Sequence, residues 1–125
     1  MKIVDAHGET TAFELLVSGA RTSTVTGTGV DIRPYQGALK IVLNSAAGSG
    51  TSPTLDVKIQ DSEDGSSYAD VSGAVFAQVT TTASTQSIRL DTRRVRRLVR
   101  VVGTIGGTSP SFNFAVIAVG QTQVI

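Results

Sequence analysis

Carboxylates, the ligands that hard cations favour, are concentrated in one short stretch of this 125-residue chain. Half of the ten acidic residues lie between positions 56 and 70. Ca²⁺ takes six to eight oxygen ligands. However, the Asp-x-Asp-x-Asp-Gly alternation of a helix–loop–helix calcium site is missing, and adjacent carboxylates on a turn are usually solvated. The five acidic residues are Asp56, Asp61, Glu63, Asp64 and Asp70.

The same stretch also has a purely structural interpretation. Within Gln60–Tyr68, a strand runs into Asp64-Gly65, where glycine's access to positive φ favours a tight turn. Tyr68, three residues after the glycine, is then expected to pack back on the strand that precedes the turn. We favour this structural turn and keep calcium binding near Asp61–Asp64 as the alternative.

Arginines are concentrated in a second stretch, since six of the eight lie within positions 89–100. The planar guanidinium pairs with carboxylates or phosphates in a bidentate manner and is common in interface ion pairs. Two interpretations are equally favoured. In the first, the arginines pair within the chain with the aspartates at 56, 61, 64 and 70 or remain solvated. In the second, they pair with carboxylates of a neighbouring subunit. Nucleic-acid binding is less favoured, because no aromatic residue that could stack on bases lies between Phe76 and Phe112.

The chain offers little for catalysis or for binding a cofactor. It has no cysteine, which excludes a disulfide, a thiol nucleophile and a Cys-ligated zinc site. His7 is the single histidine, and there is no nucleophile elbow, P-loop or dinucleotide fingerprint. The net charge of +1 argues against a general polyanion binder. We therefore expect a protein that is not an enzyme and that needs no cofactor.

The sequence shows no targeting segment and no membrane span. Met1–Val4 is followed at once by Asp5, which interrupts the apolar run that a signal peptide needs. The longest apolar runs, 98–102 and 114–119, are far shorter than the ~18 residues that span a bilayer. We expect a soluble protein that is made in the cytoplasm of its host.

The elements that position these residues are expected to be strands. Val and Thr are abundant, no long window has helical apolar periodicity, and turn residues recur roughly every 8–12 positions. We predict an all-β protein: a single antiparallel β-sandwich, jelly-roll or Ig-like, over residues 12–125, with an extended N-terminal arm over 1–11. About eight strands are expected, at 12–18, 23–32, 38–44, 55–61, 74–79, 86–90, 97–105 and 111–121.

The last two predicted strands carry more apolar residues than one core face needs. They are separated by 106–110 (GGTSP), which predicts a hairpin loop, and the small residues of 46–53 predict a flexible loop. Continuous apolar strands are typical of strands that are covered on both faces. Either these are central core strands with extra Val and Ala, or another subunit or the N-terminal arm covers their second face.

Three segments together resemble a known class of proteins. They are LDVKIQDSEDGSSY (55–68), RRVRRLVRVV (93–102) and GTIGGTSPSFNFAV (103–116). They resemble small β-sandwich virion proteins of tailed bacteriophages, namely capsid decoration (cementing) proteins or minor head proteins. The resemblance covers roughly residues 39–119.

The resemblance implies a phage virion structural protein on the capsid surface that binds the major capsid protein and stabilises the head, as a trimer or dimer. The alternatives are a head–tail connector, tail or baseplate component, and a carbohydrate- or cell-surface-binding module. We expect the contacts to come from the arm, the arginine segment and the C-terminus. The predicted contact residues are Ile3, Val4, Phe13, Arg93, Arg94, Arg96, Arg97, Val124 and Ile125.

Overall fold

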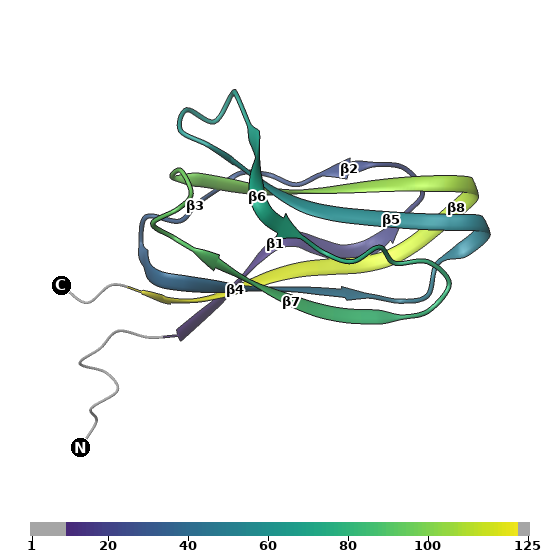
Figure 1. Ribbon diagram of the computed structural model, residues 1–125. Helices are drawn as coiled ribbons and strands as arrows, with labels where there is room; N and C mark the ends of the chain where they lie inside the picture. Colours follow the sequence, from purple (N-terminus) through teal and green to yellow (C-terminus); the bar gives the residue numbers. More distant parts are fainter. Residues whose placement is uncertain (1–9, 123–125) are drawn as a thin grey trace, which may run out of the picture.

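Alternating sequences of apolar and polar residues determine where the strands run. The computed structural model describes residues 10–122, which form eight strands and the turns between them (Figure 1). The predicted antiparallel all-β fold is confirmed, and no helix in this part of the chain has the length and apolar character needed to cross a bilayer. The strands are β1 (Thr10–Arg21), β2 (Val25–Thr26), β3 (Val30–Asp31), β4 (Tyr35–Ser45), β5 (Ser49–Ser62), β6 (Ala69–Val75), β7 (Ser84–Asp91) and β8 (Leu98–Thr122).

Two layers share β8, the longest strand. Its first part, residues 98–106, pairs with β5, β2 and β3, and β6 pairs with the other side of β5. Its last part, residues 112–122, lies between β1 and β4, and β7 pairs with the other side of β4. We call these the β5 layer and the β4 layer; in Figure 1 they lie one above the other and are joined at the right.

The predicted hairpin loop at 106–110 is wrong, because this segment is a corner at which β8 passes from one layer to the other. A hairpin would pair the strand before it with the strand after it, whereas these two parts of β8 pair with different strands. The backbone turns at Gly107 (φ +115°) and Ser109 (φ +49°). A glycine tolerates such a conformation at little cost.

β5 bends beside this corner, so the predicted flexible loop 46–53 is wrong from residue 49 onward. β5 begins at Ser49, and Thr51 pairs with Thr108 at the corner itself. Gly50 (φ +105°) bends the strand, and a Cβ at that position would lie only 2.8 Å from the Thr108 carbonyl oxygen. Small residues are therefore needed here for close approach of two strands.

Two further predicted strands differ in extent. β6 occupies Ala69–Val75 instead of 74–79, because the hairpin that it forms with β5 pairs Ala69 with Asp61 directly after the turn. The predicted strand 23–32 is interrupted between β2 and β3. There the Gly27 N–H donates to the Val101 carbonyl at 2.7 Å.

The core lies between the two layers and is built from alternate residues of the strands. β8 contributes to it from both layers, with Val99 and Val101 before the corner and Phe112 and Phe114 after it. Burying one such side chain contributes about 1.5–3 kcal/mol. The other fully buried large side chains are Leu39, Ile41, Leu43, Leu55, Val57, Ile59, Val79 and Val116.

The two ends of the described chain lie side by side. β1 begins at Thr10, which pairs with Gln121 near the end of β8. Of the expected arm 1–11, residues 1–9 lie outside the described residues, as do residues 123–125.

Candidate functional site

The acidic turn between β5 and β6 is held together by its own side chains. The Asp64 carboxylate accepts hydrogen bonds from the backbone N–H groups of Ser66 (2.8 Å) and Ser67 (3.0 Å) and from the Ser62 hydroxyl (3.0 Å). These bonds lower the pKa of Asp64 to about 2. Among residues 10–122, no three His, Cys, Asp or Glu side chains come together in a way that could hold a metal ion. The structure therefore places Asp64 in a structural turn.

Tyr68, which follows this turn, makes a contact that the sequence analysis did not predict. Its ring packs under the Arg100 guanidinium of β8, which lies 3.8 Å from the ring centre. Arg100 also donates from Nε to the side-chain oxygen of Gln60 at 3.0 Å. The Tyr68 hydroxyl reaches the backbone of Gly29, where a Cβ would collide with it. This cation–π contact accounts for one of the six clustered arginines.

Arg96 pairs inside the fold, as one of the two favoured interpretations expected. Its Nη2 and Nε donate to the Asp61 carboxylate at 2.9 and 3.2 Å, and its backbone N–H donates to the other carboxylate oxygen at 3.0 Å. The Asp61 side chain is only 12% exposed. Hydrogen bonding to Asp61 raises the pKa of Arg96 above its ordinary value. This side chain anchors the segment before β8 to the end of β5.

The other predicted arginines are much less constrained. Arg97 donates from Nε to the Glu63 carbonyl at 2.9 Å, with the Glu63 carboxylate 4.0 Å away. Arg93 is 85% exposed, and its Nε lies 3.5 Å from an Asp91 carboxylate oxygen. The Arg94 side chain is exposed and makes no hydrogen bond or ion pair with any residue in the described part of the chain.

The backbone that carries Arg93 and Arg94 is nevertheless well fixed. Asp91 accepts the Arg93 N–H on its carboxylate at 2.9 Å and the Arg94 N–H on its carbonyl at 3.0 Å. Thr92 donates from its N–H (2.9 Å) and its hydroxyl (2.6 Å) to the Gly37 carbonyl. The turn after β7 therefore presents two exposed guanidiniums from a defined backbone.

A groove of about 430 Å³ collects arginines from two distant parts of the sequence. Arg93, Arg96 and Arg97 line it together with Arg33, which the sequence analysis missed. Arg33 follows β3 and pairs with Asp31 at 2.6 Å, which lowers the pKa of that carboxyl. No local signal distinguishes Arg33, because its place in the groove depends on the β3–β8 pairing. We call this feature the basic groove.

The remaining predicted contact residues do not join these arginines directly. The Phe13 ring stacks on Tyr35 with ring centres 4.7 Å apart, and Tyr35 lines the basic groove. Phe13 thus supports the groove from within the fold. Ile3, Val4, Val124 and Ile125 lie outside the described residues.

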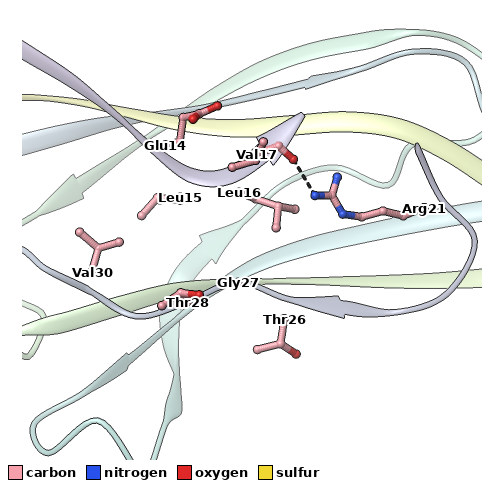
Figure 2. A pocket seen from close by; sticks show the side chains of 9 residues that line it. All are labelled: Glu14, Leu15, Leu16, Val17, Arg21, Thr26, Gly27, Thr28 and Val30. Carbon is pink, nitrogen blue, oxygen red and sulfur yellow. Dashed lines mark hydrogen bonds between the residues drawn. The ribbon is translucent and has the colours of Figure 1, made fainter. Parts of the chain in front are cut away.

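A second hollow, of about 290 Å³, lies between β1 and the β2–β3 segment (Figure 2). Glu14 and Arg21 are the titratable groups that line it. Arg21 donates to the carbonyls of Val17 (2.6 Å), Gly19 (3.0 Å) and Phe114 (3.1 Å), so its guanidinium is occupied in holding the irregular end of β1. Thr26, Thr28 and Glu14 also line the hollow, and no hydrogen bond joins the Glu14 carboxylate to either threonine hydroxyl.

Comparison with known proteins yields similar structures and no family. No model of a known protein family matches the sequence, and no curated protein is similar to it. One similar structure is the SPBc2 prophage-derived protein YomS, with 13% identity, a TM-score of 0.47, and coverage of 90% of this chain and 94% of that one. Another comes from the Bacillus endospore appendages, described as disulfide-linked pili, with 19% identity, a TM-score of 0.46 and 94% coverage of each chain. At this level the likenesses assign no function to the chain.

Proposed function

We propose that this chain is a non-enzymatic structural protein of a tailed-phage particle, which binds the major capsid protein on the capsid surface and stabilises the head. The phage context comes from the sequence resemblance. The observation that carries the binding role is the fixed turn that presents Arg93 and Arg94 beside the basic groove. Arginines held in this way suit carboxylates on a partner protein.

The weak internal pairing of these two arginines supports this role. An exposed ion pair such as Arg93–Asp91 contributes little to folding. Both guanidiniums can therefore pair with carboxylates of a partner without a large loss of folding stability. Because the backbone beneath them is already ordered, less conformational entropy is lost on binding. The contact fits a segment of the capsid protein that carries exposed Asp or Glu side chains.

A capsid lattice makes a modest contact of this kind sufficient. Many copies bind one fixed array, and oligomeric binding to neighbouring sites raises the effective affinity without new contacts. A protein that binds the assembled shell and not its separated subunits stabilises that shell by mass action. This role requires neither a cofactor nor catalysis.

Binding to purified heads that lack this chain tests the proposal. We expect Arg93→Glu to weaken binding at least tenfold, because it reverses a charge that faces the partner. Lys58→Glu is the matched control, since Lys58 pairs with Asp70 at 3.0 Å on another surface, and it should bind like wild type. Equal binding of the two variants, or no binding of the wild type, would overturn the proposal.

Copy number in purified virions separates the proposed role from its alternative. A decoration protein should be present in hundreds of copies per particle. Six or twelve copies would contradict decoration and favour a head–tail connector, tail or baseplate component.

A further inference from the structure

The outer face of the β4 layer carries aliphatic side chains that the core does not use. Alternation places Val42 of β4 and Ile117 and Val119 of β8 on this face, where each is partly exposed, while the residues between them are buried. Ile117 pairs directly with Val42. The extra apolar residues of the last predicted strand therefore form, together with Val42, a partly exposed apolar stripe on the surface of the single chain.

The outer face of the β5 layer has a different character. Val102 lies on that face opposite Lys58, and the next pair along is Gln60 with Arg100. Lys58 and Gln60 both donate to the Asp70 carboxylate, at 3.1 and 2.8 Å. Val75 of β6 lies on this face too, opposite Lys58, and is 59% exposed. Val75 and Val102 are separated by Lys58, so the apolar residues of this face stand singly among polar side chains that bond to one another and form no continuous stripe.

Unpaired charges flank the apolar stripe, with one sign on each side. Lys40 of β4 and Arg89 of β7 are direct cross-strand partners, and both are exposed. Like charges in such positions repel. Within residues 10–122 neither side chain forms a hydrogen bond or ion pair, although Asp91 lies close enough to Arg89 for a weak electrostatic effect. On the other side, Glu14 of β1 is exposed opposite Ile117 and is equally without a partner in that range.

We propose that this face binds a second copy of the same chain, sheet against sheet. The strands of the β4 layer lie in the order β1, β8, β4, β7. A two-fold axis that runs parallel to the strands and passes between β8 and β4 therefore has two strands on each side. Rotation about this axis places the β1 side of each copy over the β4–β7 side of the other. Ile117 then faces Val42 of the second copy, and Glu14 comes within reach of Lys40 and Arg89.

This arrangement gives the unpaired charges partners of opposite sign and buries the apolar stripe at the same time. Packed sheets lie about 10 Å apart, a distance that facing side chains fill. Interfaces with two-fold symmetry must be self-complementary. Each copy has an acidic residue on one side of the axis and two basic residues on the other, so the same set of opposite charges meets at two places in the dimer. Neither a capsid nor any other partner is needed, so the inference is independent of the proposed function.

Sedimentation velocity of the full chain, across a range of concentrations, tests the dimer. We expect the wild type to dimerise and Ile117→Asp to raise the dissociation constant at least tenfold. Val102→Asp is the matched control, because it puts the same charge on a partly exposed valine of the same strand in the other layer. It should dimerise like the wild type.

Charge reversal tests the geometry of the dimer. Glu14→Lys should weaken the dimer by placing three positive charges together. Combining it with Lys40→Glu and Arg89→Glu should restore the dimer, because complementarity returns with the signs exchanged. A wild type that stays monomeric at all concentrations, a dimer that Val102→Asp dissociates and Ile117→Asp does not, or no recovery in the triple variant would overturn the proposal. Circular dichroism would confirm that each variant is folded.

Discussion

Arg96 holds the Asp61 carboxylate from three donors, although the two residues lie 35 positions apart in the sequence. The pair connects the end of β5 to the segment that enters β8. Two arginines of one cluster thus have opposite roles: Arg96 stabilises the fold, whereas Arg93 extends into solvent.

The first prediction contrasts these two arginines. Arg96→Ala should lower the midpoint of thermal unfolding clearly, because it leaves a largely buried carboxylate without its charged partner. Arg93→Ala should leave the midpoint nearly unchanged, since its exposed pair contributes little. Differential scanning calorimetry of both variants checks the contrast. Equal losses in the two variants would show that the Arg96–Asp61 contact is not an anchor.

The second prediction concerns acid unfolding. The pKa of Asp64 is lowered to about 2 from its usual value near 3.8, so its contribution to the free energy of unfolding is complete above pH ~4 and is lost as the pH falls toward 2. Hydrogen bonding also lowers the pKa values of Asp31, Asp70 and Asp91, which add to the same slope.

Urea unfolding of the wild type and of Asp64→Asn between pH 2 and 6 measures this effect. The variant should be less stable than the wild type at pH 6, and the difference should narrow as the pH approaches 2. A difference that stays constant over this range would contradict the proposed role of the Asp64 carboxylate.

The third prediction concerns the corner between the two layers. Gly107→Ala should destabilise the protein by about 1–3 kcal/mol from backbone conformation alone. The total loss of stability should be larger than this, because the new Cβ would lie 2.7 Å from the Ser52 carbonyl oxygen. Gly73→Ala is the control, since Gly73 also has positive φ (+81°) but has open space around it. Urea unfolding should show the larger loss for Gly107→Ala, and the reverse order would refute the importance of this close approach.

The sequence predicted the strands best where one face is buried and the other is wet. Residues 38–44 and 55–61 alternate with a period of two, and both segments lie inside observed strands with the expected faces buried. The prediction was poorest at 106–110, because glycines and a proline suit a hairpin and a corner equally well. The choice between the two depends on which distant strands pair.

The candidate site was predictable in part for the same reason. The density of arginines at 89–100 indicated an important segment, and internal pairing was one of the expected outcomes. Which of them pairs inside the fold could not be predicted, since Asp61 reaches Arg96 only after β5 and β8 align. Arg33 likewise lies in the basic groove only because β3 pairs with a distant strand, β8.

By itself the sequence determined the all-β class, the turn at Asp64-Gly65 and the lack of cysteine chemistry, because these follow from residue type and from neighbours a few positions away. Only the tertiary structure decided that β8 serves both layers, that Arg96 anchors while Arg93 and Arg94 remain exposed, and that Lys40 and Arg89 stand side by side. Strand pairing brings together residues that are tens of positions apart. Its register is set by how the alternating apolar faces of several strands pack into one core, so no single stretch of the chain determines it.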